Sequence, residues 1–214
     1  YLGMIGEGSS TMMVSFAAPS PSAWVARFAC LIPEHGEVLD LACGSGRHSR
    51  LLASLGHRVE AVDRDPQALA RLADVERVTG RQADLESGAW PYAGRSFAGI
   101  VVTNYLFRPR LDDLLDSLAD PGLLIYETFM IGNERFGKPS NPDFLLRSQE
   151  LLARVQRRGW RVLAFEEGAL ALPRPAMVQR LCAARGDADC RLFAADPACQ
   201  SLDAGGRQVV GGEG

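Results

Sequence analysis

Two neighbouring segments of the chain carry residue types that together would suit a nucleoside. Residues 40–46 are Asp-Leu-Ala-Cys-Gly-Ser-Gly, and Asp63 ends the apolar run that follows. Glycines in a strand-to-helix turn let the backbone approach a ligand, and an acid at the end of the next strand accepts hydrogen bonds from both ribose hydroxyls. The third glycine of a complete phosphate-binding turn is missing, because Arg-His-Ser follows Gly46. The pattern predicts a nucleoside pocket; the alternatives are a turn that binds nothing and a surface acid.

Further polar residues follow other predicted strands at the points where those strands end. Asp84 comes after a short strand that ends near Ala83, and Asn104 and Tyr105 come at the end of the next one. Open α/β sheets bind ligands at the carboxyl ends of their strands, so we expect Asn104 and Tyr105 to reach a ligand or substrate. The alternatives are a polar loop at Asp84 and, at the other two positions, a polar strand end with a buried aromatic residue.

A long connection after another strand is a candidate lid. Glu127 lies in that strand, and the connection that follows, residues 132–142, is rich in glycine and proline and carries Arg135 and Lys138. Loops of this kind often close over a site, and an arginine there could hold an anionic or electron-rich substrate with two hydrogen bonds. The alternative is a solvated surface loop.

The elements that must position these residues alternate between strand and helix. Apolar residues at helical spacing predict helices over 22–31, 46–55, 66–72, 111–118 and 148–158. Apolar runs predict strands over 38–43, 59–63, one ending near 83, 97–104, 123–129, 161–166 and 178–183. Such alternation is typical of a doubly wound sheet. The last two strands are joined without room for a good crossover helix, so we expect one of them to be antiparallel.

Length and composition fit one globular domain. The chain has 214 residues, of which 47% are hydrophobic and 23% charged, and a net charge of −3. This length suits a single core, which we place at residues 14–186. Residues 1–13 are expected to be an N-terminal extension, partly foreign to the natural chain, and residues 187–214 a loosely structured tail. The negative net charge argues against binding nucleic acid through bulk charge.

The sequence predicts neither a membrane span nor export. No apolar run has the roughly 18–20 residues that a membrane-spanning helix needs, and the first residues lack the pattern of a signal peptide. The five cysteines form no Cys-x-x-Cys pair, which favours reduced thiols over a disulfide framework or a metal site. We therefore expect a cytoplasmic protein without a bound metal. No pattern indicates an oligomeric state.

Residues 36–130 resemble the class I methyltransferases that use S-adenosylmethionine, in the order and the spacing of these motifs. The layout is similar to that of the compact bacterial group that includes tellurite-resistance and thiopurine-type enzymes. The resemblance implies a Rossmann-like, seven-stranded mixed sheet with one antiparallel strand near its C-terminal end and helices on both faces. It also implies S-adenosylmethionine as the cofactor. The expected ligand contacts are Asp40, Ala42, Gly44, Gly46, Asp63, Arg64, Asp84, Leu85 and Asn104.

The resemblance implies a role for several of these residues. Asp40 would orient the turn and contact the methionine amino group, directly or through water. Asp63 would hold the ribose, and Arg64 would border the adenine. Asp84 would accept a hydrogen bond from the adenine amino group, with Leu85 as the apolar neighbour whose backbone amide meets the ring.

The implied reaction is methyl transfer from the sulfonium to a small-molecule acceptor by in-line displacement, which releases S-adenosylhomocysteine. The candidate catalytic residues are Asn104, Tyr105, Glu127 and Arg135. Glu127, or its neighbour Tyr126, would act as a base only for an acceptor that arrives protonated. The chain lacks the Asn/Asp-Pro-Pro-Tyr/Phe sequence of enzymes that methylate amines of nucleic acids or proteins, so nucleobase methylation is disfavoured. Two alternatives stay open: a non-catalytic S-adenosylmethionine-binding protein and, less favoured because the third glycine is missing and the sheet is mixed, an NAD-dependent oxidoreductase.

Overall fold

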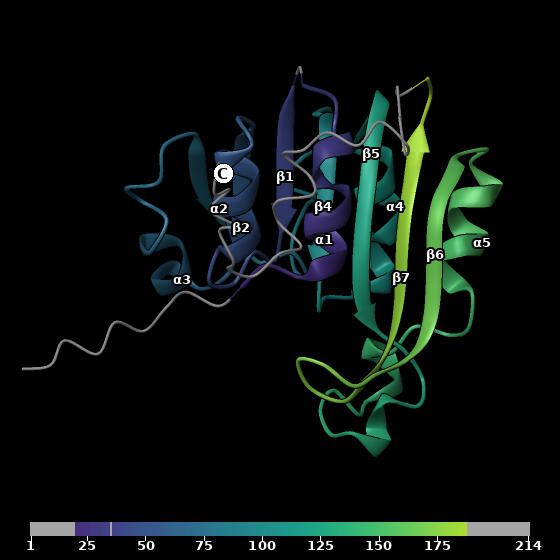
Figure 1. Ribbon diagram of the computed structural model, residues 1–214. Coiled ribbons are helices and arrows are strands. Elements are labelled where there is room, and N and C mark those ends of the chain that lie inside the picture. Colours follow the sequence, from purple (N-terminus) through teal and green to yellow (C-terminus); the bar gives the residue numbers. More distant parts are fainter. Residues whose placement is uncertain (1–19, 35, 188–214) are drawn as a thin grey trace, which may run out of the picture.

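Seven strands and the helices on both faces of their sheet make up the structure, a computed structural model that describes residues 20–34 and 36–187 (Figure 1). The strands are β1 (Glu37–Leu41), β2 (Arg58–Asp63), β3 (Val78–Gln82), β4 (Phe97–Thr103), β5 (Leu118–Phe129), β6 (Arg161–Leu170) and β7 (Ala176–Arg185). The α-helices are α1 (Ala23–Phe28), α2 (Arg47–Ser54), α3 (Pro66–Ala70), α4 (Leu111–Asp116) and α5 (Glu150–Arg157). Short 3-10 helices are η1 (Ala29–Leu31), η2 (Arg108–Arg110), η3 (Asn133–Arg135) and η4 (Pro142–Phe144).

The strand order in the sheet is β3-β2-β1-β4-β5-β7-β6. The five strands from β3 across to β5 are parallel, whereas β7 is antiparallel to both of its neighbours, β5 and β6. The predicted seven-stranded mixed sheet with one antiparallel strand is therefore confirmed. The predicted N-terminal extension (residues 1–13) and the tail from residue 188 onward lie outside the described residues.

Central strands are buried on both faces, which is why they stand out in the sequence as continuous apolar runs. In β4 the six residues from Phe97 to Val102 are all buried. The edge strand β6 differs, since its residues are only partly buried or exposed, and its pairing with β7 continues to Leu170, beyond the predicted end at 166. Backbone pairing on an edge strand does not need apolar side chains. The apolar pattern in the sequence therefore predicted an end for this strand that is too early.

Helix and strand starts differ from the predictions for local reasons. The structure begins α5 at Glu150 rather than at 148, because Gln149 has a left-handed φ of 58°, which a helix cannot continue. The structure begins β5 at Leu118 rather than at 123, because Leu118 pairs with Phe97 before a register shift in the ladder. The predicted helix over 22–31 is α1 followed by the 3-10 turn η1, and the Ser22 side chain caps it by accepting from the Trp24 N–H.

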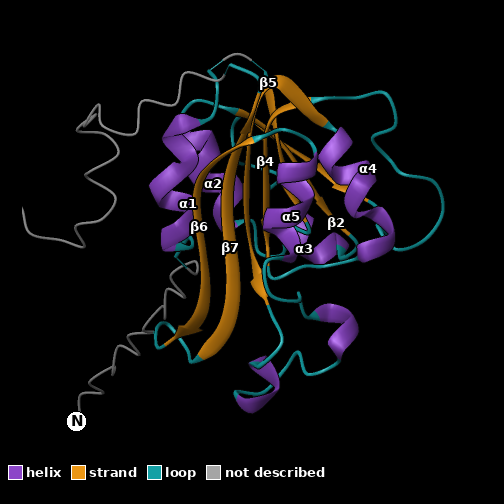
Figure 2. Ribbon diagram, turned by 90° about the vertical axis from the view of Figure 1, so that its right-hand side faces the viewer, coloured by secondary structure: helices purple, strands orange, loops and turns teal. Residues whose placement is uncertain are grey.

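Helices cover both faces of the sheet (Figure 2) and pack on it through apolar residues. On one face, α1 and α2 pack through Trp24, Phe28 and Leu52. On the other, α4 and α5 pack through Leu115 and Leu151. Within the described chain, no helix is long and apolar enough to cross a membrane.

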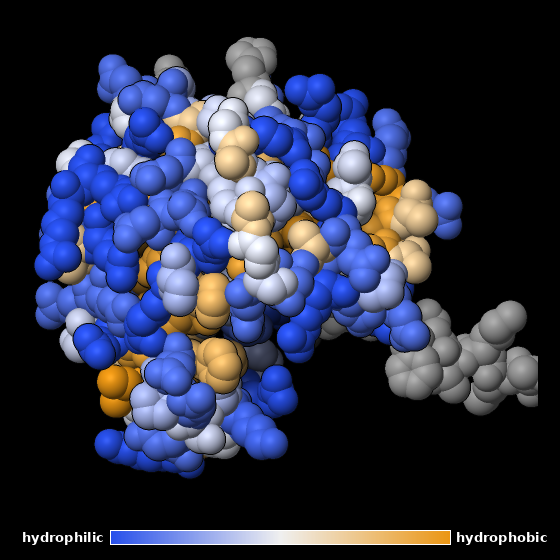
Figure 3. All heavy atoms as spheres, turned by 180° about the vertical axis from the view of Figure 1, so that it is seen from behind, coloured by the Kyte–Doolittle hydropathy of each residue, from blue (hydrophilic) through white to orange (hydrophobic). Residues whose placement is uncertain are grey.

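A small lobe extends beyond the carboxyl ends of the parallel strands, at the bottom of Figure 1. It consists of residues 131–146, with η3 and η4, and of the turn between β6 and β7, residues 171–175. The Asn133 side chain joins the first part to the start of β7 by accepting from the Met177 N–H at 3.1 Å. Apolar surface shows on the lobe at the lower left of Figure 3. The exposed large apolar residues are Ile131, Phe136, Phe144 and Leu172.

Candidate active site

A cavity of about 340 Å³ opens at the carboxyl ends of β1, β2 and β4, where the strand order reverses between β1 and β4. Doubly wound sheets bind ligands at such a switch point, and this volume lies within the range of small-molecule sites. The cavity is lined by Ala42, Asp63, Arg64, Ala83, Asp84, Leu85, Glu86, Tyr105 and Phe144. Sequence motifs at the ends of four different strands therefore meet at one place.

The turn after β1 has an unusual backbone that opens this edge of the sheet. Ala42, Gly44 and Gly46 all have positive φ angles, of 53°, 53° and 73°. Asp63 fixes the turn from β2, because its Oδ2 accepts from the Gly44 N–H at 2.8 Å and its Oδ1 accepts from the Asp65 N–H at 2.9 Å. Each carboxylate oxygen has a second lone pair, so both oxygens can still accept a hydrogen bond from a ligand.

Gly46→Ala is expected to destabilise the fold, and Gly44→Ala to do so much less. A Cβ at Gly46 would lie 2.4 Å from Leu72 Cδ2, whereas a Cβ at Gly44 meets nothing within 4 Å. Both variants carry the backbone strain of a positive φ, about 1 kcal/mol, and only Gly46→Ala adds overpacking of about 1–3 kcal/mol. Urea unfolding of both variants would measure the difference, and equal losses would contradict the packing described here.

Asp40 lies inside the fold, below the turn and not on the cavity wall. The side chain is 1% exposed, and its Oδ2 accepts from the Ser49 hydroxyl at 2.5 Å. Burial raises the pKa of Asp40 to about 6, and the bond from Ser49 opposes this rise. Asp40 thus joins β1 to the first turn of α2. Because its pKa is about 6, nearby charged groups can change its protonation state.

Asp84 and Tyr105 line the cavity with different polar groups. The Asp84 carboxylate accepts from the Glu86 N–H and the Ser87 hydroxyl, each at 3.0 Å, and these bonds lower its pKa. The Tyr105 hydroxyl is buried and has no hydrogen-bond partner among the described residues. Tyr126, itself buried, donates its hydroxyl to the Tyr105 carbonyl at 2.9 Å and so holds that segment in place. The site therefore offers an ionised acceptor and an unused hydroxyl.

The structure does not bring all candidate residues onto the cavity wall. Asn104 is exposed next to Tyr105, with a φ of 55°, at the end of β4. Arg135 is exposed on the lobe, in η3, and is not among the lining residues. Gly44 and Gly46 are in the turn beside the cavity rather than on its wall.

Glu127 belongs to a separate buried polar cluster behind the ends of β4 and β5. Its Oε1 accepts from the Ser22 hydroxyl at 2.9 Å, and its Oε2 lies 2.7 Å from Arg180 Nε in an ion pair. The Ser22 N–H donates to His48 Nε2 at 3.1 Å, and Thr103 Oγ1 lies 3.4 Å from His48 Nδ1. Burial lowers the pKa of His48 to about 3, so the ring is neutral at physiological pH. The cluster connects the start of α1 to the edge of the sheet where the parallel strands end.

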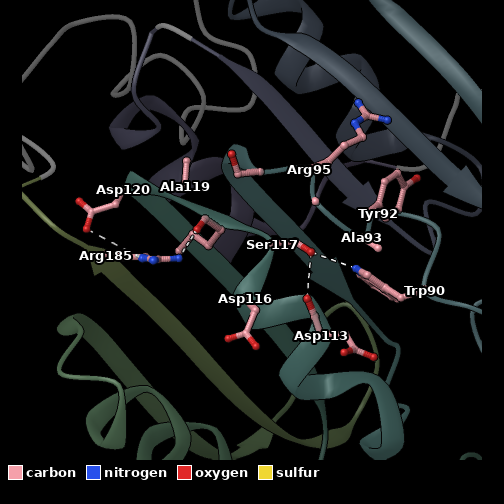
Figure 4. A pocket seen from close by; sticks show the side chains of 13 residues that line it. Trp90, Tyr92, Ala93, Arg95, Asp113, Asp116, Ser117, Ala119, Asp120 and Arg185 are labelled. Atoms are coloured by element: carbon pink, nitrogen blue, oxygen red, sulfur yellow. Dashed lines mark hydrogen bonds and ion pairs between the residues drawn. The ribbon is translucent and has the colours of Figure 1, made fainter.

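A larger cavity, of about 480 Å³, lies at the opposite edge of the sheet, where β4 and β5 begin (Figure 4). Its polar groups are engaged with one another: the Ser117 hydroxyl accepts from the Trp90 indole at 3.0 Å and donates to the Asp113 carbonyl at 2.9 Å. Asp120 faces Arg185 across 4.0 Å. This edge carries the amino ends of the strands, where α/β sheets do not place their ligands, so volume alone does not make it the active site.

The described residues contain no group of three or more His, Cys, Asp or Glu side chains that could hold a metal ion. Cys43 is a free, buried thiol, and Cys182 is buried as well. Cys30 is disulfide-bonded, so the expectation of reduced thiols is wrong at that position. The cysteine pattern consequently gives no support for a cytoplasmic location.

Comparison with known proteins agrees with this site. A family model described as a methyltransferase domain matches residues 38–120. Protein-L-isoaspartate O-methyltransferase of Chlorobium limicola is 34% identical over 98 residues, which are 44% of this chain and 44% of that protein. TehB from Haemophilus influenzae superposes with a TM-score of 0.59 at 20% identity, covering 75% of this chain and 61% of TehB. The glycopeptide N-methyltransferase MtfA complexed with S-adenosyl-L-homocysteine superposes with a TM-score of 0.53 at 20% identity. The superposition covers 76% of this chain and 89% of MtfA.

Residues 38–120 therefore match a methyltransferase domain, and the fold of the chain is similar to that of solved methyltransferases. The matched segment includes the turn after β1, Asp63 and Asp84. The chain spans 44% of the length of its curated relative and 61% of that of TehB.

Proposed function

We propose that the chain binds S-adenosylmethionine in the cavity at the ends of β1, β2 and β4 and transfers its methyl group to a small-molecule acceptor. The observation that carries this proposal is that Ala42, Asp63 and Asp84, from three separate motifs, line one cavity of about 340 Å³. All three residues lie within the matched methyltransferase domain.

The residues of the cavity fit this donor. Asp63 keeps a free lone pair on each carboxylate oxygen for two ribose hydroxyls. Asp84 stays ionised and can accept from the adenine amino group, and the unpaired Tyr105 hydroxyl can supply a further hydrogen bond. We assign Asp40, beneath the turn, to the amino group of the methionine part, whose positive charge would favour the ionised carboxylate.

The chain itself has little bond-making chemistry to perform. S-adenosylmethionine supplies a methyl group on a positively charged sulfur that is already a good leaving group. The residues therefore act mainly by positioning the acceptor and excluding water. We place Asn104 and Tyr105 at the methyl end, because they follow β4 at the edge where the cavity opens.

The buried contacts of two base candidates favour structural roles. Glu127 is ion-paired with Arg180 and accepts from Ser22, so we assign it to fastening α1 rather than to removing a proton. Tyr126 donates its hydroxyl to the Tyr105 carbonyl and positions the cavity wall. Arg135, exposed on the lobe, remains a candidate contact for an anionic acceptor.

Thermal unfolding with added ligands tests the donor, and labelled transfer tests the reaction. S-adenosylmethionine should raise Tm in a saturable manner, because a ligand that binds only the folded state stabilises it, whereas NAD should not. Transfer of a labelled methyl group from the donor to a member of a metabolite panel should follow. Stabilisation by NAD alone would favour an oxidoreductase. Stabilisation by the donor without transfer to any acceptor in the panel would favour a binding protein.

A further inference from the structure

Phe144 lines the donor cavity, although it lies far along the chain from the strand ends that supply the other lining residues. It belongs to η4 in the lobe, and its side chain is 43% exposed. A large aromatic side chain left this open beside a cavity presents a flat apolar surface to whatever the cavity holds. The rest of the wall includes the apolar Ala42, Ala83 and Leu85.

The segment that follows Phe144 is firmly docked on the end of β5. Leu145 and Leu146, which follow Phe144, are buried. The Leu146 N–H donates to the Phe129 carbonyl at 3.0 Å, and the Ile131 N–H donates to the Leu146 carbonyl at 2.9 Å. The exposure of Phe144 is thus a property of an ordered segment.

Arg108 holds the backbone immediately before and after Phe144. Its Nη1 donates to the Asp143 carbonyl at 2.7 Å, and its Nη2 donates to the Leu145 carbonyl at 2.6 Å. Nη1 also lies 3.4 Å from the Pro142 carbonyl, a longer bond. Arg108 starts η2, three residues after the cavity-lining Tyr105, so one guanidinium joins the wall made by β4 to the wall made by the lobe.

Glu150, at the start of α5, fixes the guanidinium in turn. Arg108 Nε and Nη2 donate to its two carboxylate oxygens at 2.8 and 2.9 Å, and the Arg147 N–H donates to Oε2 at 2.9 Å. The bond to Glu150 raises the pKa of Arg108. Burial alone would raise the pKa of Glu150, but the hydrogen bonds from Arg108 and the Arg147 N–H, together with the nearby arginine charges, outweigh burial and lower that pKa. Paired in this fork, Arg108 has a fixed geometry that a lysine cannot reproduce.

We propose that Phe144 stacks on the adenine ring of the bound donor and that Arg108 is the positioning residue that holds Phe144 there; this rests on the proposed function. Adenine has a flat π-face, and aromatic side chains that stack on bases contribute strongly to affinity. A phenylalanine held at 43% exposure by contacts on both flanks suits this role, because little freedom remains to be lost on binding.

Isothermal titration of the full chain with S-adenosylhomocysteine tests the proposal. Phe144→Ala should weaken binding about 5- to 100-fold, the range found for base–aromatic stacking, whereas Phe144→Tyr should retain affinity. Arg108→Lys should also weaken binding. In the Phe144→Ala background, Arg108→Lys should have no further effect, since the two changes remove one interaction.

Two matched variants control for surface and charge effects. Phe136→Ala removes an aromatic side chain of the lobe that is 44% exposed and does not line the cavity. Arg110→Lys changes another arginine of η2, one that is ion-paired with Asp113. Both should bind within about twofold of the wild type.

Three outcomes would overturn the proposal in distinguishable ways. If the wild type binds S-adenosylhomocysteine and Phe144→Ala binds it with the same affinity, Phe144 does not stack on the adenine, but the proposed function remains intact. Additive losses in the double variant remove the positioning role of Arg108. No binding of S-adenosylhomocysteine by the wild-type chain removes this proposal and the proposed function together.

Discussion

Asp63→Ala is expected to lower the affinity for S-adenosylmethionine by about 2–4 kcal/mol, or roughly 30- to 1,000-fold. The carboxylate is the only group we assign to the two ribose hydroxyls, and hydrogen bonds to charged groups contribute more than neutral ones. The same side chain also holds the Gly44 N–H at 2.8 Å, so its loss frees the turn that the donor must approach. Isothermal titration would measure the change.

Asp65→Ala is the matched control for this prediction. Asp65 is an adjacent acid whose side chain caps α3 by accepting from the Gln67 N–H at 2.8 Å, and it does not line the cavity. Its removal should cost about 1 kcal/mol of stability and leave donor affinity nearly unchanged. If folded Asp63→Ala bound the donor as tightly as the wild type, the ribose assignment would be wrong.

Asp40 should make both stability and donor affinity depend on pH. Its pKa rises from 3.8 to about 6 on folding, mainly through burial. Between these pH values the folded chain binds more protons than the unfolded chain. The stability that protonated Asp40 contributes is therefore fully present below pH 3.8 and is lost as pH rises through 6. The rise corresponds to about 3 kcal/mol of unfolding free energy.

Urea unfolding of the wild type and Asp40→Asn at several pH values would measure this contribution. Because asparagine does not titrate, the variant should gain stability relative to the wild type as pH rises from about 4 to 7, by up to about 3 kcal/mol. Ser49→Ala should move the pH at which this stability is half lost upward, because the hydrogen bond from Ser49 lowers the pKa of Asp40 and so opposes the effect of burial. A stability difference independent of pH would contradict the buried state of Asp40.

Donor affinity should change in the opposite direction. The positively charged amino group assigned to Asp40 interacts better with the ionised carboxylate, so affinity should rise between about pH 5 and 7 in the wild type. Asp40→Asn should bind more weakly and lose this rise. An equal pH dependence in both proteins would show that another group titrates.

The sheet and part of the candidate site could be predicted because the sequence patterns that indicate them are local. Buried parallel strands are continuous apolar runs, and Asp63 and Tyr105 come at the ends of such runs, whereas Asp84 follows the short edge strand β3. Strand ends of a parallel sheet meet at one edge, so the sequence was enough to bring these residues together. The positive φ of Ala42 was not predictable, because alanine rarely adopts it.

The parts that could not be predicted depend on side-chain direction and on contacts between distant segments. Glu127 and Tyr126 are adjacent in β5 and therefore point to opposite faces, but the sequence does not say which neighbours each will meet. Glu127 meets Arg180 and Ser22, so it lies in the cluster behind the strand ends. Arg108 and Phe144 belong to short 3-10 helices without apolar periodicity, and only the folded chain joins them.

The central claim is that the cavity at the ends of β1, β2 and β4 is the donor site. A crystal structure of the chain with S-adenosylhomocysteine tests it most directly. The account predicts ribose hydroxyls within hydrogen-bond distance of both Asp63 carboxylate oxygens and adenine between Leu85 and Phe144. Ligand bound instead in the cavity beside Ser117 and Arg185, at the opposite edge of the sheet, would contradict it.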